Sequence, residues 1–170
     1  ACVAVHGAGE GLLINNTICD GADAGVFIFE SGIAVLTENV IAGNCAVGVH
    51  IADSADVLLK HNTVEASGQA GVLVELSANA TLEDNVILHN GAAGVEVRHK
   101  AWVTLLTNTV RQNKLEGVWV HKAGTAHVEK CTFSQNGRNG NIWVHADCQG
   151  NVVCDSNTFE GIGWSNFEIE

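Results

Sequence analysis

Three residues with side chains suited to acid–base chemistry recur at a constant spacing, because Glu75, Arg98 and His121 are separated by 23 positions each. If residues 23 apart lie on neighbouring strands, these side chains are about 5 Å apart. A base such as His121 could then remove the proton next to a uronate carboxylate while Arg98 holds the developing charge, as in polysaccharide lyases. The alternative, which we favour, is a cross-strand ion pair that contributes less than about 1 kcal/mol. Glu75, Arg98 and His121 are therefore candidate catalytic residues with no assigned reaction.

A second series, two positions earlier in each copy of this spacing, combines large apolar side chains with one carboxylate. Large apolar groups on an outward face require an explanation. Three explanations remain open: docking of a protein partner, coverage by a neighbouring segment, and stacking on sugar rings. We favour docking of a protein partner. The candidate binding residues are Phe27, Leu73, Glu96, Trp119, Trp143 and His145.

Other chemistries find less support in the residue pattern. Glycoside hydrolysis needs two carboxyl groups at a defined separation, and calcium-dependent lyases need several converging carboxylates. Acidic residues such as Asp53 and Asp84 are instead scattered among turn positions. His121 and His145 lack a clear third ligand for zinc. We expect no metal and no cofactor, with calcium possible only if the chain acts on a polysaccharide.

An internal repeat defines the elements that would position these residues. Gly-Val-x-Val or a close relative recurs every 23 residues, with clear copies starting at Gly25, Gly48, Gly71, Gly94 and Gly117. Weaker copies start at Cys2 and Asn141, which gives seven in all. Such a repeat indicates a solenoid in which each copy is one structural unit.

Each copy contains short β-branched runs separated by Gly, Asn, Ser or Ala, which is typical of strands and turns. A leucine column, which includes Leu36, Leu59 and Leu82, falls 11 positions after each start, and an asparagine column falls at 14. Three short strands per coil, stacked about 4.8 Å apart, make a parallel β-helix in which these columns point inward. We expect the asparagines to hydrogen-bond along the stack, with a looser contact where Cys131 replaces one.

The coil resembles a known repeat, as Gly71-Val72-Leu73-Val74, Leu82-Glu83-Asp84-Asn85-Val86-Ile87 and Asn90-Gly91-Ala92-Ala93-Gly94 illustrate. These strings resemble right-handed parallel β-helix repeats of carbohydrate-binding and sugar-hydrolase domains, and most closely those of eukaryotic F-box-only substrate adaptors. The resemblance implies an all-β, right-handed parallel β-helix of about seven coils. It implies little about activity, since such repeats occur in lyases, epimerases, hydrolases and noncatalytic scaffolds. The Asp-Pro-His-Asp signature of alginate epimerases is impossible here, because the chain has 0 Pro.

Composition excludes several classes of partner. With 8 Lys plus Arg against 19 Asp plus Glu, the formal charge of −11 disfavours nucleic acid and anionic membranes. No apolar run approaches the roughly 20 residues of a membrane span. The 6 cysteines show no CxxC spacing, so we expect reduced thiols and a cytoplasmic protein, or a secreted one if it acts on carbohydrate.

We therefore expect residues 1–170 to form a single β-helix domain, as a fragment of, or capped within, a larger chain or assembly. The expected function is a noncatalytic scaffold that presents a rigid surface to a protein partner. It could serve as a ubiquitin-ligase substrate adaptor or as a structural subunit of a large complex. The alternative is a carbohydrate-active protein: a polysaccharide lyase or epimerase, a glycoside hydrolase or a sugar-binding module.

Overall fold

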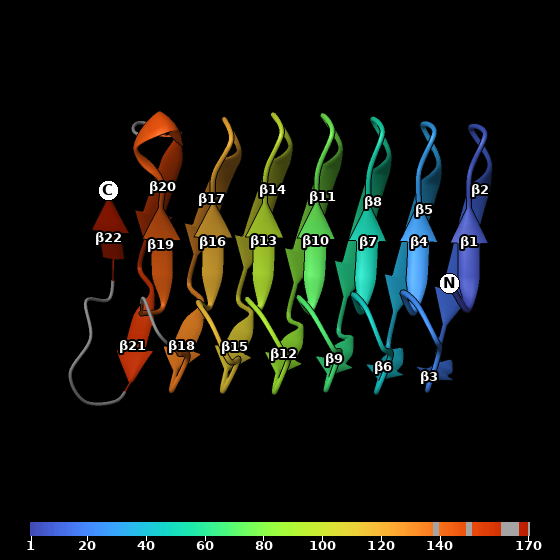
Figure 1. Cartoon of the computed structure of the whole chain (residues 1–170), viewed down its shortest axis with the longest axis horizontal. Coiled ribbons are helices and arrows are strands. Elements are labelled where there is room, and N and C mark those ends of the chain that lie inside the picture. The colour runs from blue at the N-terminus through green and yellow to red at the C-terminus, as the bar shows by residue number, and fades with distance from the viewer. Residues whose placement is uncertain (138–139, 149–150, 161–166, 170) are drawn as a thin grey trace.

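The chain winds into stacked coils around one long axis, and each coil contributes one strand to each of three sheets (Figure 1). This computed structural model describes residues 1–137, 140–148, 151–160 and 167–169. Every strand pairing in the described residues is parallel, so each strand lies beside the equivalent strand of the next coil. A short 3-10 turn, η1 (Ala146–Cys148), interrupts the all-β pattern in the last coils.

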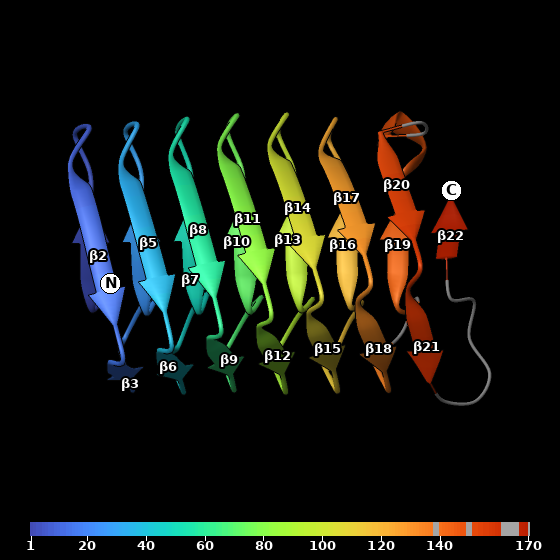
Figure 2. The ribbon, with the colours of Figure 1, turned by 180° about the vertical axis from the view of Figure 1, so that it is seen from behind.

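The three sheets each run the length of the solenoid. The first sheet has 8 strands in the described residues: β1 (Val3–Val5), β4 (Val26–Ile28), β7 (Val49–Ile51), β10 (Val72–Val74), β13 (Val95–Val97), β16 (Val118–Val120), β19 (Ile142–Val144) and β22 (Phe167–Ile169). The second has 7: β2 (Glu10–Ile14), β5 (Ile33–Thr37), β8 (Asp56–Lys60), β11 (Asn79–Glu83), β14 (Trp102–Leu106), β17 (Thr125–Glu129) and β20 (Val152–Asp155). The third also has 7: β3 (Thr17–Cys19), β6 (Val40–Ala42), β9 (Thr63–Glu65), β12 (Val86–Leu88), β15 (Thr109–Arg111), β18 (Thr132–Ser134) and β21 (Thr158–Glu160). Figure 1 looks onto the first sheet, and Figure 2 looks from behind onto the second.

The register confirms that residues 23 apart lie on neighbouring coils. Leu59 pairs with Leu36 on one side and with Leu82 on the other, and all three are 0% exposed. The valine, isoleucine and leucine columns form one continuous core. Each fully buried member stabilises the fold by about 1.5 to 3 kcal/mol. The predicted all-β parallel β-helix of about seven coils is therefore correct.

Tight turns between the first and second sheets keep the coils in register. In five successive coils this turn contains two adjacent non-glycine residues with positive φ: Glu30–Ser31, Asp53–Ser54, Leu76–Ser77, His99–Lys100 and Lys122–Ala123. Their φ angles lie between 50° and 64°. Such conformations are strained for L-residues and persist only where surrounding structure fixes them. Here the hydrogen bonds of the stack fix them, as when the N–H of Ser77 donates to the carbonyl of His99 at 3.0 Å.

Two asparagine ladders run inside the solenoid, of which the sequence analysis identified one. In the predicted ladder, the backbone N–H and Nδ2 of Asn62 both donate to Oδ1 of Asn85, at 2.8 and 3.0 Å. At Cys131 the N–H of Asn108 donates to sulfur at 3.4 Å, which is the longer contact expected there. The second ladder comprises Asn44, Ser67, Asn90, Asn113 and Asn136. In both ladders, the side-chain amides hydrogen-bond to buried backbone N–H and carbonyl groups that would otherwise have no partner.

Candidate functional site

The outward face of the first sheet gathers the candidate residues. From β1 to β19, each three-residue strand of this sheet directs its first and last residues toward the core and its middle residue outward. The residue that follows each of these strands, such as Phe29, Glu75 or Arg98, also lies on the outward face. These two positions per coil supply a double row of side chains along the strands of the first sheet, which follow one another along the axis of the solenoid.

Glu75 stands at the centre of this face and accepts three hydrogen bonds. Its Oε1 lies 2.9 Å from Nε2 of His50 on the preceding coil. Its Oε2 lies 2.8 Å from Nε of Arg98 and 3.2 Å from Nδ1 of His99 on the following coil. Because an ionised carboxylate only accepts, each of these imidazole nitrogens carries a hydrogen.

Arg98 connects Glu75 to a second carboxylate. Its Nη1 donates to Oε1 of Glu96 at 2.9 Å, and the same oxygen lies 2.9 Å from Nε2 of His121. We name His50, Glu75, Arg98, Glu96 and His121 the polar row. Both carboxylate side chains are only 11% exposed, so the row is packed against the sheet rather than fully hydrated.

Two members of the polar row, Glu75 and Arg98, are held in their charged forms by their neighbours. Burial by itself would raise the pKa of Glu75, but hydrogen bonds from Arg98 and two histidines, with the charge of Arg98, lower this pKa from 4.5 to about 2. Burial by itself would lower the pKa of Arg98, but its two carboxylate partners raise it above its ordinary value. Glu75 is therefore a carboxylate, and Arg98 a cation, throughout the physiological pH range.

Stacked rings flank the polar row at both ends. Towards the N-terminus, Phe27 lies between Phe29 and His50, with ring centroids 4.3 and 4.5 Å apart. Towards the C-terminus, Trp119 lies between His121 and Trp143, with centroids 4.0 and 5.5 Å apart. Phe27 and Trp119 thus each stack on two neighbouring rings. This stacking leaves less of their ring faces free for a ligand.

The structure unites most of the predicted residues and separates one from the rest. Glu75, Arg98 and His121 belong to the polar row together with Glu96, and the two ring stacks contain Phe27, Trp119 and Trp143. Leu73 also faces outward, but at 6% exposure it is an apolar floor between its neighbours. His145 pairs instead with Asp147, Nδ1 to Oδ1 at 2.8 Å, in the last coils.

Two functional-site residues, His50 and His99, were absent from the predicted set. His50 occupies the same column as Glu96, so its position alone could have indicated it. His99 lies in the turn after β13, where its positive φ of 53° directs the chain back past Glu75. Its contact depends on that turn and has no signal in the 23-residue spacing.

The geometry limits the acid–base chemistry that this face can perform. His121 was the candidate base, but its Nε2 contacts Glu96, and Arg98 already contacts two carboxylates. His50 and His121 lie three coils apart, or roughly 14 Å at about 4.8 Å per strand spacing, so they cannot act on one carbon. Glu75, held ionised, cannot serve as a proton donor near neutral pH. The arrangement favours binding over proton transfer.

Within the ranges that the structure describes, no three His, Cys, Asp or Glu residues cluster in a way that could hold a metal ion. The part of the chain that is described includes no helix long and apolar enough to cross a membrane.

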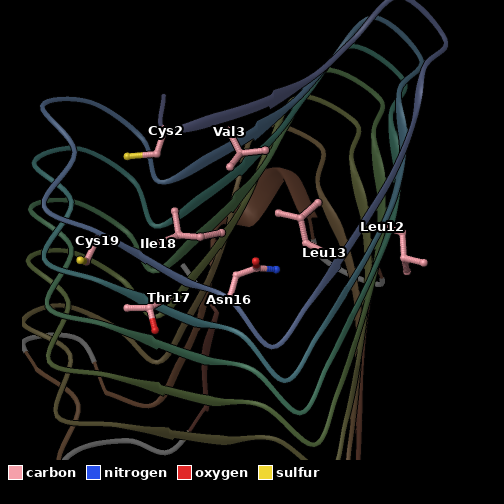
Figure 3. A pocket seen from close by; sticks show the side chains of 8 residues that line it. All are labelled: Cys2, Val3, Leu12, Leu13, Asn16, Thr17, Ile18 and Cys19. Atoms are coloured by element: carbon pink, nitrogen blue, oxygen red, sulfur yellow. The ribbon is translucent and has the colours of Figure 1, made fainter.

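Cavities elsewhere on the molecule do not coincide with the polar row. A cavity of about 470 Å³ opens at the first coil, where Figure 3 shows side chains from β1, β2 and β3 around it. Its lining includes Val3, Leu13 and Ile18, which are core positions in later coils. Shallower grooves follow the second sheet, beside the exposed side chains of Leu12 and Ile33.

Comparison with known proteins supports the fold and its handedness. Residues 1–168 match the family described as "Right handed beta helix region". Two solved structures from Azotobacter vinelandii are similar, both A-modules of mannuronan C-5 epimerases. For AlgE4 the TM-score is 0.79 at 20% identity, over 98% of this chain and 54% of that one. For AlgE6 it is 0.63 at 19% identity, over 98% and 56%.

This chain therefore spans little more than half the length of the two epimerase modules. At such identity the likeness concerns the fold. No curated protein matches the sequence. None of these findings supports a particular closeness to F-box adaptors, whereas the structural neighbours belong to the carbohydrate-active class of the alternative interpretation.

Proposed function

Because the chain belongs to the right-handed β-helix family, we propose that it is a carbohydrate-active protein that binds a polysaccharide along the outward face of the first sheet. The observation that carries this proposal is the polar row, a continuous series of fixed donors and acceptors flanked by aromatic side chains. Such a face suits an extended polymer, because its donors and acceptors follow one another along the axis from coil to coil.

The spacing of the face supports a linear ligand. The polar row covers four coils, and the aromatic groups extend the face from Phe27 to Trp143, roughly 24 Å at about 4.8 Å per strand spacing. Sugar hydroxyls both donate and accept hydrogen bonds, so they can pair with carboxylates, guanidinium and imidazole alike. The positive φ turns and the ladders hold these groups rigidly, which lowers the ordering cost of binding.

The proposed class of ligand, a polysaccharide, follows from the two similar structures. Both are epimerases of mannuronan, a polysaccharide, and both share this fold over nearly all of this chain. Their reaction is not proposed for this chain, since His121 and Arg98 are already engaged by Glu96 and Glu75. The proposed activity is therefore binding without turnover.

A binding assay with matched variants tests the proposal. Titration calorimetry against a panel of soluble polysaccharides should give saturable binding to at least one. Trp143→Ala, at one end of the face, should weaken it at least tenfold. Trp102→Ala removes an indole that is 52% exposed on the second sheet, and should leave binding unchanged.

Arg98→Ala and Arg98→Lys probe the polar row itself. Either should weaken binding, because the two-sided geometry of the guanidinium is lost. Circular dichroism shows whether each variant is folded. Absence of binding to every polysaccharide, or equal loss in Trp143→Ala and Trp102→Ala, contradicts the proposal.

A second candidate function is the protein-docking scaffold, and one observation favours it. Leu12, Ile14 and Ile33 gather on the N-terminal part of the second sheet, at 69%, 53% and 49% exposure. Apolar groups so grouped on a surface are typical of interaction sites. Specific capture of a protein that is lost in Leu12→Ser with Ile33→Ser, with no polysaccharide binding, would favour this second function.

A further inference from the structure

The charge of the first-sheet face indicates which polysaccharide it can accept. Resting on the proposed function, we infer that the ligand is an uncharged polysaccharide rather than a polyuronate.

Arg98, the one Lys or Arg among the described residues of the face, has no uncompensated charge to offer. Arg98 donates through Nε to Glu75 and through Nη1 to Glu96, so two carboxylates surround one guanidinium. Its side chain is 27% exposed, and both partners are less exposed than it is. A uronate carboxylate that approached Arg98 would also approach those two negative charges. Hydroxyl groups of an uncharged sugar could donate to the same carboxylates without repulsion.

The turns between the first and second sheets form one edge of the face, which we call the rim. Its charged residues in the described ranges are Glu30, Asp53, Lys100, Lys122 and Asp147. All five are exposed. Together with the polar row they give five carboxylates against three Lys or Arg cations. Carboxylates therefore outnumber lysine and arginine on the face and its rim.

The distribution of rim charge matters as much as its sum. Lys100 and Lys122 lie on adjacent coils, where the N–H of Lys100 donates to the carbonyl of Lys122 at 3.3 Å. They could attract one or two carboxylates locally. Glu30 and Asp53 occupy the same edge two to four coils away, and a polymer with a carboxylate on every sugar would meet them as well. The formal net charge of −11 adds a long-range repulsion of the same sign.

A pair of polymers with the same sugar backbone, one charged and one methyl-esterified, tests the inference. Fully methyl-esterified pectin and pectate have the same backbone, but only pectate carries free carboxylates. In buffer with EDTA and low salt, the ester should bind at least tenfold more tightly than pectate. Added salt should strengthen pectate binding by screening the repulsion, and should leave the ester unaffected. A mannan and a β-glucan extend the uncharged series, and calcium replaces EDTA in a parallel titration.

Rim variants sharpen the test without touching the polar row. Glu30→Gln with Asp53→Asn should raise the affinity for pectate about threefold to tenfold and leave the ester unchanged. Glu10→Gln with Asp56→Asn is the matched control, because it removes the same charge from exposed positions on the second sheet. The control should change neither affinity by more than about twofold.

The outcomes separate this inference from the proposed function. Binding of the uncharged polymers with weak or absent binding of pectate supports the inference. Pectate that binds as tightly as its ester, with EDTA or only with calcium, overturns it and leaves polysaccharide binding intact. Failure of every polymer to bind overturns both.

Discussion

The inner asparagine ladder and the outward face of the first sheet are built on the same coils, and they use the repeat in opposite ways. Asn39, Asn62 and Asn85 make the same contacts at each step, with the N–H donating to the next Oδ1 at 2.9, 2.8 and 2.9 Å. On the outward face, His50, Leu73 and Glu96 are just as regularly spaced and differ at every step. Uniformity marks the side chains that hold the coils together, and variation marks those available to a partner.

The largest loss of stability is expected from a substitution in the inner asparagine ladder. Asn85→Ala removes the acceptor of the backbone N–H and Nδ2 of Asn62, and the donor to the carbonyl of Leu59. These groups are buried, so we expect a loss of about 3 to 5 kcal/mol in the free energy of unfolding. Urea denaturation measures it. Asn16→Ala, at the exposed start of the ladder, should cost about 1 kcal/mol, and equal costs would contradict the comparison.

On the outward face, Glu75 should contribute to the free energy of unfolding in a way that depends on pH. The pKa of Glu75 is lowered to about 2 in the folded protein, below its ordinary 4.5, so its contribution is fully present above about pH 4.5. It is lost as the pH falls from 4.5 towards 2, and amounts to about 3 kcal/mol. Unfolding free energies measured over this range should fall less steeply in Glu75→Gln than in the unaltered protein. Glu83→Gln, which removes an exposed partner of Lys60, is the control and should keep the acid dependence.

A gain of stability is expected where the second ladder is incomplete. The hydroxyl of Ser67 is buried and has no hydrogen-bond partner. Asn44 and Asn90 occupy the equivalent positions on either side, each next to a glycine that leaves room for the amide. Ser67→Asn should therefore stabilise the fold by about 1 kcal/mol, measured as a higher urea midpoint at unchanged slope. Ser67→Ala shows whether filling the gap, rather than losing the hydroxyl, is responsible.

The smallest effect is expected at an exposed position outside both regions. Trp102 lies on the second sheet and its only described side-chain hydrogen bond joins Nε1 to the hydroxyl of Thr104 at 3.4 Å. Trp102→Ala should change the free energy of unfolding by about 0.5 kcal/mol or less. A larger change would show that exposed side chains on the second sheet also stabilise the fold.

The sequence was sufficient for the fold because the fold depends on repeated, self-similar contacts. Leu36, Leu59 and Leu82 could be placed on one another from their spacing alone, and Glu75 beside Arg98 likewise. Contacts that cross the repeat could not be predicted this way. His50 reaches Glu75 over 25 positions, and Trp119 stacks on His121 within one coil. Both depend on rotamers chosen by local packing, for which a spacing pattern contains no information.

For the outward aromatic rings the sequence left three explanations open, namely protein docking, coverage by a neighbouring segment and stacking on sugar rings. Phe27 and Trp119 occupy outward positions as predicted, and each stacks on one ring of its own coil and one ring of the next coil. Column position determines the side of the sheet on which a side chain lies. It does not determine the angle at which a ring stands.

Every strand pairing described here joins a coil only to the coil before and the coil after it. The molecule is thus a one-dimensional chain of nearest-neighbour links, and its cooperativity should decay with distance from any defect. Amide exchange should be slowest in the middle coils and quickest at the outermost ones. Duplication of one complete 23-residue unit would lengthen the solenoid, leave every interior contact of the remaining units unchanged, and displace the two halves of the outer face by a single step.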